Sequence, residues 1–170
     1  SGYHTNYHTV PGSYEHVMGT KEGGNILILG GCGPMGLGAV SYALAFENKP
    51  KRVVVTDISD DRVERAKQVI SIEDAKAAGV ELHYVNTAAM EDQEKELMDI
   101  TEGHGYDDVF PYMFRSTGVA ELGNKLLAYD GCMNLFAGPT DSKFSANMNL
   151  YDCHYSRTKI WEAPGEPLKI

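Results

Sequence analysis

The clearest chemical signal in the chain is a glycine-rich turn, in which Gly31, Gly33 and Gly36 have the spacing G-x-G-x-x-G. An apolar run over residues 25–29 leads into the turn, and a pattern of helical period begins at Pro34. Such a turn between a strand and a helix can hold a diphosphate, because helix amides and the helix dipole favour anions. We therefore predict a dinucleotide-binding turn. A glycine-rich turn without a ligand is the alternative.

Each residue of the turn has its own expected task. Gly31 permits a tight turn, Gly33 lets the backbone approach the diphosphate, and Gly36 lets the helix pack against the strand. Pro34 suits the first helical turn, where its missing N–H is not needed. Cys32 is expected to be a small residue that fills the turn and not a nucleophile.

An acidic residue, Asp57, ends the next apolar run, 21 residues after Gly36. At this position a carboxylate is expected to accept hydrogen bonds from the adenosine ribose. The 2′-phosphate of NADP would meet like charge, at roughly 4 kcal/mol for unit charges about 4 Å apart at an effective dielectric near 20. The sequence thus favours NAD. Arg62 could reach such a phosphate, but we expect it to pair with Asp60 or Asp61 on the next helix.

Further cofactor contacts are expected in the loops after later strands, because ligands of open parallel sheets bind at the carboxyl ends of the strands. Asn86 and Thr87 follow the third expected strand and suit the adenine side. Residues 113–116, and the pair Gly138 and Pro139, follow the fourth and fifth strands and suit the nicotinamide. Ordinary loop chemistry is the alternative at each place.

Catalytic groups are not expected in this chain. His4 and His8 are four residues apart, but they lie among weak helix formers without a third ligand, which favours solvated or packed histidines over a metal pair. His154 and Tyr155 could form an acid–base pair but have no evident partner. We expect neither a catalytic tyrosine–lysine pair nor a zinc-ligand set. Cofactor binding without the proton-handling residues of catalysis is therefore the prediction.

Composition narrows the classes of function. The 170 residues, 42% of them hydrophobic, suit one ordinary globular domain. A net charge of −9 disfavours nucleic acid as a partner. No apolar run approaches the roughly 18 residues that span a bilayer, and no signal peptide or membrane partner is expected. Three widely spaced cysteines favour the reducing cytoplasm over a disulfide framework.

Strands and helices alternate along the chain, which predicts an α/β fold with a parallel sheet between two helical layers. The expected strands are 25–29, 52–56, 81–85, 108–112, 132–137 and 159–161. The expected helices are about 34–47, a segment starting after 59–61, 72–78, 90–101 and 119–127. We predict a lead-in segment over residues 1–24 with a short helix near 14–18, a Rossmann domain over 25–162 with an extended stretch at 144–150, and a tail over 163–170.

Longer motifs carry a family resemblance over about residues 10–160. They are EGGNILILGGCGPMGLGAVSYAL, VVVTDISDDRVERAK, GYDDVFPYM, LAYDGCMNLFAGP and NLYDCHYS. In this order they resemble the medium-chain, zinc-type dehydrogenases, and most closely the bacterial sorbitol dehydrogenase and L-sorbose-1-phosphate reductase branch. The resemblance implies the NAD(H)-binding domain of an oxidoreductase that transfers hydride to or from a polyol or sugar phosphate. Zinc and the catalytic residues would belong to a domain outside this chain.

The resemblance also implies a doubly wound Rossmann sheet of six strands in the order 3-2-1-4-5-6 and a homodimer joined through sheet edges. The positions that would hold the diphosphate are Gly31, Gly33, Pro34, Met35 and Gly36, and Asp57 would hold the ribose. After Ile160 the chain departs from the family, because WEAPGEPLKI stands where a glycine-rich continuation is expected.

Two other functions use a similar turn. A non-catalytic Rossmann module could sense NAD or adenine nucleotides for a partner, since catalytic residues are not expected. An S-adenosylmethionine-dependent methyltransferase also combines a glycine turn with an acidic residue, but the second half of the G-x-G-x-x-G spacing argues against it.

Overall fold

The chain forms one six-stranded sheet in which all neighbouring strands are parallel. The computed structural model describes residues 2–113, 117–136 and 141–161. The strands of the sheet are β3 (Asn25–Leu29), β4 (Arg52–Asp57), β5 (Glu81–Asn86), β6 (Tyr106–Pro111), β7 (Leu127–Asn134) and β8 (Lys159–Trp161). Their spatial order is β5-β4-β3-β6-β7-β8, which confirms the predicted order 3-2-1-4-5-6.

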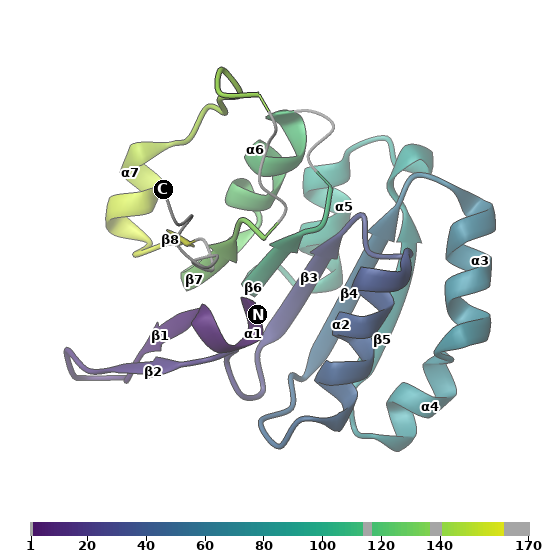
Figure 1. Cartoon of the computed structure of the whole chain (residues 1–170). Helices are drawn as coiled ribbons and strands as arrows, with labels where there is room; N and C mark the ends of the chain where they lie inside the picture. The colour runs from purple at the N-terminus through teal and green to yellow at the C-terminus, as the bar shows by residue number, and fades with distance from the viewer. Residues whose placement is uncertain (1, 114–116, 137–140, 162–170) are drawn as a thin grey trace, which may run out of the picture.

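Helices cover both faces of this sheet, as Figure 1 shows. They are α2 (Pro34–Ala45), α3 (Asp60–Val69), α4 (Ile72–Ala77), α5 (Gln93–Ile100), α6 (Thr117–Lys125) and α7 (Leu150–Tyr155), with a short 3₁₀ turn η1 (Thr87–Ala89). The three-layer α/β prediction is therefore confirmed.

The central strand β3 explains why two helical layers form. Its side chains alternate in direction, so Ile26 and Ile28 pack with α2, α3 and α4, whereas Leu27 and Leu29 pack with α5 and α6. All four are almost completely buried. Each such side chain contributes about 1.5–3 kcal/mol through burial. An apolar run without alternation is therefore required at this position, and the sequence supplies one.

Several element bounds differ from the prediction. The fourth strand is residues 106–111 and not 108–112. The helix expected over 90–101 is α5, which is shorter at Gln93–Ile100 and follows the 3₁₀ turn η1. β7 begins at Leu127, five residues before the predicted start, because the apparent turn before Gly131 is an irregularity inside the strand. Asp130 has a positive φ of 60° there, and the pairing register with β6 shifts.

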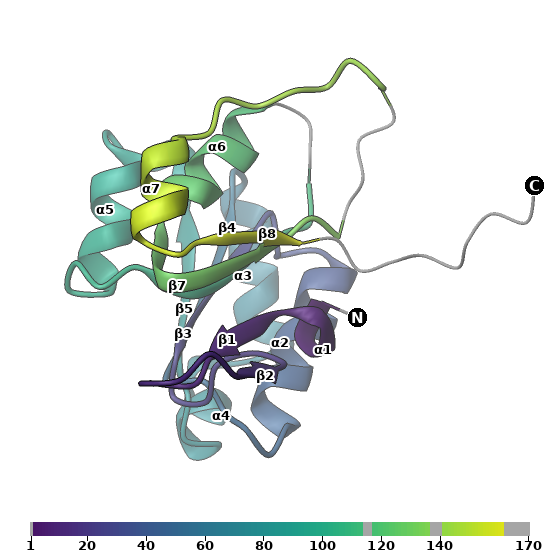
Figure 2. The same cartoon turned by 90° about the vertical axis from the view of Figure 1, so that its left-hand side faces the viewer.

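The extended stretch predicted over residues 144–150 forms no strand. Residues 144–149 have no regular secondary structure, and α7 begins at Leu150. The side chain of Asn149 caps this helix by accepting hydrogen bonds from the amides of Tyr151 and Asp152, at 3.0 and 3.4 Å. Figure 2 shows α7 and α6 on one side of β7 and β8, and the N-terminal segment on the other. The predicted tail at 163–170 lies outside the described residues.

The N-terminal segment also differs from its prediction. It consists of α1 (Gly2–Thr5) and an antiparallel hairpin of β1 (Tyr7–Thr9) and β2 (His16–Met18). The helix expected near residues 14–18 is therefore wrong, because Gly12, with φ of 77°, turns the chain so that Val17 pairs with His8. Residues 25 and 162 as domain limits stay a prediction.

Polar side chains at the amino ends of the strands attach this segment to the sheet. The carboxylate of Asp108 is fully buried and accepts from Asn6 Nδ2 (2.7 Å), His8 Nε2 (2.9 Å) and the Lys21 amide (2.9 Å). Asp130 accepts from the Thr9 amide and hydroxyl and from Lys159 Nζ, at 2.6–2.7 Å. None of the helices in the described part of the chain is both long and apolar enough to span a membrane.

Candidate dinucleotide site

The glycine turn joins β3 to α2 and is fixed by the end of β4. The amide of Gly30 donates to Thr56 Oγ1 (3.2 Å), and the amide of Gly31 donates to the Thr56 carbonyl (2.9 Å). The residue with positive φ is Gly30, at 71°, and not Gly31. Gly31 is needed for a different reason, because a Cβ there would overlap Ile28 and lie 2.8 Å from Val55 Cγ1.

The other two glycines of the pattern differ in their surroundings. A Cβ on Gly36 would overlap the carbonyl of Gly31, so α2 could not approach the turn as closely with any other residue. A Cβ on Gly33 would enter open space. Gly33 is also the N-cap of α2 and provides no side chain to satisfy the first-turn amides, while Pro34 occupies the start of the helix. Met35 is exposed beside them. The turn can therefore accept an anion at open backbone amides.

Cys32 is buried within the turn. Burial, and then the neighbouring Asp57 carboxylate, raise the pKa of the Cys32 thiol to about 11. Because the thiolate is the nucleophilic form, this environment suppresses nucleophilic chemistry and supports the interpretation of Cys32 as packing.

Asp57 ends β4 next to the turn and is only 3% exposed. Its Oδ1 accepts from the amide of Ile58 (2.8 Å) and lies 3.4 Å from Nη1 of Arg62. The expected pairing of Arg62 with Asp60 or Asp61 is wrong, since the first turn of α3 directs this guanidinium back toward the end of β4. Asp57 Oδ2 accepts no hydrogen bond from the described residues. One carboxylate oxygen is therefore left for a ligand.

Asn86 and Thr87, at the end of β5, shape the neighbouring loop. Asn86 Oδ1 accepts from the amide of Ala88 (2.9 Å), and its Nδ2 donates to Asp60 Oδ1 (2.7 Å). Thr87 Oγ1 donates to the carbonyl of Asp57 (3.4 Å). The side chain of Asn86 thus has protein partners at both ends, whereas Thr87 connects the ends of β4 and β5.

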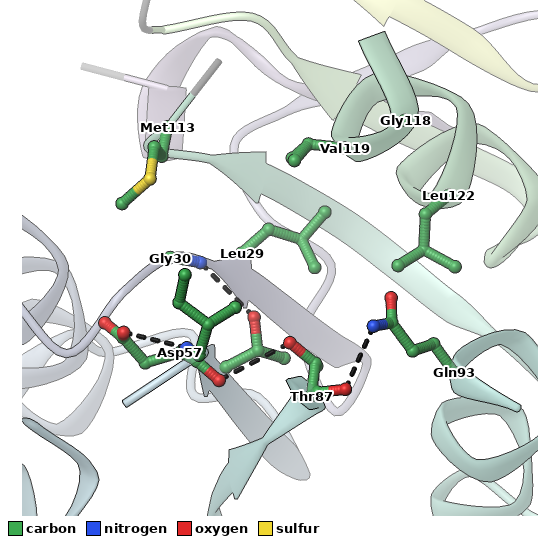
Figure 3. Close-up of a pocket in the computed structure, with 11 residues that line it drawn as sticks. Leu29, Gly30, Asp57, Thr87, Gln93, Met113, Gly118, Val119 and Leu122 are labelled. Carbon is green, nitrogen blue, oxygen red and sulfur yellow. Dashed lines mark hydrogen bonds between the residues drawn. The ribbon is translucent and has the colours of Figure 1, made fainter. Parts of the chain in front are cut away.

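A cavity of about 330 Å³ opens at this edge of the sheet, between the ends of β3, β4 and β5 and the start of α6. Figure 3 shows Asp57 and Thr87 on one side of it and Val119 and Leu122 on the other. The lining residues are Leu29, Gly30, Thr56, Asp57, Ile58, Thr87, Gln93, Met113, Gly118, Val119 and Leu122. Apolar walls with a few polar groups at one side suit a heteroaromatic base joined to a sugar.

The structure brings only part of the predicted set together. Asp57 and Thr87 line the cavity, as does Met113 from the predicted loop, while the glycine turn adjoins it through Gly30. The other predicted nicotinamide residues, 114–116, Gly138 and Pro139, lie outside the described residues. Gln93, on the first turn of α5, was missed, although its place just after the third strand of the sheet was an available signal.

The histidines near the N-terminus do not form a pair. His4 Nε2 lies 2.9 Å from the hydroxyl of Tyr42, whereas His8 is buried against Asp108. Within residues 2–113, 117–136 and 141–161, no group of three or more His, Cys, Asp or Glu side chains is placed to hold a metal ion.

A tyrosine–lysine pair at i and i+4 does occur once, at Tyr155 and Lys159, contrary to expectation. Tyr155 ends α7, but Lys159 begins β8, so one helix does not carry both side chains. Nζ of Lys159 instead donates to the carbonyl and carboxylate of Asp130 (2.9 and 2.7 Å), while Tyr155 and His154 contact each other's rings. Neither member of the pair, nor His154, lines the cavity.

No protein-family model matches the chain, but known proteins with similar sequences were found. The chain is 48% identical over 158 residues to mannitol-1-phosphate 5-dehydrogenase of Aliivibrio fischeri, which covers 93% of this chain and 37% of that protein. It is 41% identical over 156 residues to L-sorbose 1-phosphate reductase of Klebsiella pneumoniae, with 92% and 36% covered.

Solved structures agree on the fold. Benzyl alcohol dehydrogenase of Acinetobacter calcoaceticus superposes with a TM-score of 0.65 at 20% identity, over 89% of this chain and 38% of that one. A protein described as a zinc-binding dehydrogenase of Sinorhizobium meliloti, solved bound to NADP, gives 0.63 at 17% identity, over 88% and 40%.

The chain is therefore similar to the medium-chain, zinc-type dehydrogenases. The resemblance identified from the sequence, including the sorbose-phosphate reductase branch, is confirmed. The chain spans little more than a third of the length of these relatives, at 37% and 36%.

Proposed function

We propose that this chain binds NAD(H) at the carboxyl edge of its sheet and is the cofactor-binding part of a polyol or sugar-phosphate dehydrogenase. The observation that carries the proposal is the arrangement of Asp57. Its buried carboxylate keeps one oxygen without a donor from the described residues, between an apolar cavity and a glycine turn with open amides. A dinucleotide needs these three environments, for its ribose, its adenine and its diphosphate, at one edge of a sheet.

The chain's own residues would bind and orient the cofactor. The amides after Gly33 at the start of α2 would hold the diphosphate, with Gly31, Pro34, Met35 and Gly36 keeping the backbone close. Asp57 would accept from the ribose hydroxyls. Bound in this way, the nicotinamide cofactor supplies or accepts a hydride. Zinc and the residues that handle the alcohol proton would come from the part of the relatives that this chain does not span.

NAD is proposed over NADP because Asp57 is buried at the ribose position and would repel a 2′-phosphate. Arg62 is the group that opposes this preference, since its half-exposed guanidinium lies 3.4 Å from the same carboxylate. One structural relative is bound to NADP, so the two cofactors need direct comparison. The names of the sequence relatives support a phosphorylated polyol or sugar as the substrate of the whole protein. The three free cysteines suit the cytoplasm.

Titration of the chain with NADH, NADPH and S-adenosylmethionine tests this function. Binding is measured by nicotinamide fluorescence and calorimetry for the native chain, Asp57→Ala and Asp61→Ala. We expect NADH to bind more tightly than NADPH. Asp57→Ala should weaken NADH about ten-fold, as expected for the loss of charge-assisted hydrogen bonds. Asp61→Ala is the control, because Asp61 is exposed in the first turn of α3; this variant should change the NADH affinity little. Equal NADH affinities of Asp57→Ala and Asp61→Ala, or tighter binding of NADPH than of NADH by the native chain, would contradict the assignment of Asp57 to the ribose.

A further inference from the structure

The cavity beside Asp57 contains one polar side-chain group whose purpose the cofactor's ribose and diphosphate do not explain. Thr56 Oγ1 already accepts from the amide of Gly30, and Thr87 Oγ1 donates to the carbonyl of Asp57. Asp57 serves the ribose. Among the described residues that line the cavity, the remaining polar side chain is Gln93.

Gln93 is held in a defined orientation. Its Nε2 donates to the carbonyl of Thr87 at 2.9 Å. Because a carbonyl can only accept, the amide nitrogen must face Thr87 and the amide oxygen must point elsewhere. Figure 3 shows that oxygen directed into the cavity toward Leu122. Gln93 is exposed, and its Oε1 accepts no hydrogen bond from any residue that the structure describes. An acceptor held in place by Thr87 is therefore available to a ligand at the mouth of the cavity.

Resting on the proposed dinucleotide function, we propose that Gln93 is the residue that selects adenine, by accepting a hydrogen bond from its 6-amino group. The cavity is the apolar compartment nearest to Asp57, and its walls at Leu29, Val119 and Leu122 suit the faces of a purine. A ribose held by Asp57 would place its base there, with the base edge toward α5.

The selectivity follows from donor and acceptor chemistry. Adenine carries an amino donor at position 6, whereas hypoxanthine and guanine carry a carbonyl acceptor there. Gln93 cannot adapt by flipping its amide. After a flip, Nε2 would no longer donate to the carbonyl of Thr87, and Oε1 would face that carbonyl. A 6-oxo purine therefore loses one hydrogen bond and places two acceptors together, and a neutral hydrogen bond corresponds to about three- to ten-fold in affinity.

Reduced nicotinamide hypoxanthine dinucleotide is the direct probe, because it differs from NADH only at the base. Both are titrated into the native chain and into Gln93→Met, which keeps the length of the side chain but removes the acceptor. Lys95→Met is the matched control, since Lys95 is exposed on the same helix and outside the cavity. Circular dichroism checks that each variant is folded.

We expect the native chain and Lys95→Met to bind NADH three- to ten-fold more tightly than the hypoxanthine analogue, and Gln93→Met to bind both equally. Gln93→Met should lose affinity for NADH alone. Equal binding of the two dinucleotides by the native chain would overturn the role of Gln93, and so would a preference that survives in Gln93→Met. If the native chain bound neither dinucleotide, the proposed function would fail and the base selection with it.

Discussion

The two ends of the parallel strands each bury a carboxylate, and the two carboxylates differ in how completely the protein uses them. At the amino ends, Asp108 is fully buried, and its two oxygens together accept three hydrogen bonds from the N-terminal segment. At the carboxyl ends, Asp57 is 3% exposed, and its Oδ1 accepts from the amide of Ile58 and faces Arg62 at 3.4 Å. Its second oxygen has no donor among the described residues.

This difference separates a structural carboxylate from one available to a ligand. A buried charge is stable when hydrogen bonds replace water, as they do around Asp108. A buried carboxylate with spare capacity beside a cavity is the arrangement expected where a ligand supplies the missing donors. Burial alone does not distinguish the two residues, whereas the number of their hydrogen-bond donors does, and this difference supports the proposed ribose contact of Asp57.

The largest effect should come from removing the structural carboxylate. Asp108→Ala leaves Asn6, His8 and the Lys21 amide without their acceptor in a buried place. We expect the free energy of unfolding to fall by roughly 3 kcal/mol, because each unsatisfied buried donor costs about 1–3 kcal/mol and the segment relaxes in part. Urea unfolding followed by circular dichroism measures this change.

Asp99→Ala is the control for that comparison. Asp99 forms an exposed pair with Lys95 on α5, so its removal should leave the free energy of unfolding almost unchanged. NADH affinity, measured where Asp108→Ala is still folded, should stay within about two-fold of the native value. If Asp108→Ala were no more costly than Asp99→Ala, the amino ends would not be the anchored part of the sheet.

The next effect tests the glycine turn at the opposite end. Gly36→Ala places a Cβ against the carbonyl of Gly31, so α2 must move away from the turn and NADH affinity should fall more than ten-fold. Gly38→Ala, two residues along the same helix, meets no atom within 4 Å. That variant should retain NADH binding. Its free energy of unfolding should rise by up to about 1 kcal/mol, because alanine favours a helix more than glycine does. Equal NADH affinities in the two variants would contradict the packing role of Gly36.

The carboxyl edge was more predictable from the sequence than the amino edge. The glycine spacing, Asp57 and the strand order depend on local patterns and on topology, and the sheet of six parallel strands formed as expected. Within the site, the exact partners were not predictable. The positive φ belongs to Gly30 and not Gly31, and Arg62 turns toward Asp57, because both features depend on how β4 lies against the turn.

At the amino edge, long-range contacts decide the structure. Asn6 and Asp108 are 102 residues apart in sequence yet share a hydrogen bond, and no local pattern indicates it. The hairpin of β1 and β2 was missed for the same reason, since its strands are three residues each and it is held by Asp108 and Asp130. Gln93 was missed because the direction of its amide oxygen depends on the hydrogen bond from its Nε2 to the carbonyl of Thr87, which the sequence does not reveal.

The smallest effect concerns pH and the amino edge alone. Burial by itself would raise the pKa of Asp130, but Lys159 and the two hydrogen bonds from Thr9 outweigh it and bring the pKa below the ordinary 3.8. A carboxyl whose pKa is lower in the folded state stabilises fully above the unfolded pKa and loses that contribution as pH falls through the folded one. Stability should therefore drop below about pH 4, and Asp130→Asn should lose this part of the dependence. Unfolding in urea between pH 6 and pH 3 measures both slopes. If the free energy of unfolding of the native chain and of Asp130→Asn had the same dependence on pH, the charge of Asp130 would not help to attach the hairpin, and of these two carboxylates only Asp108 would do so.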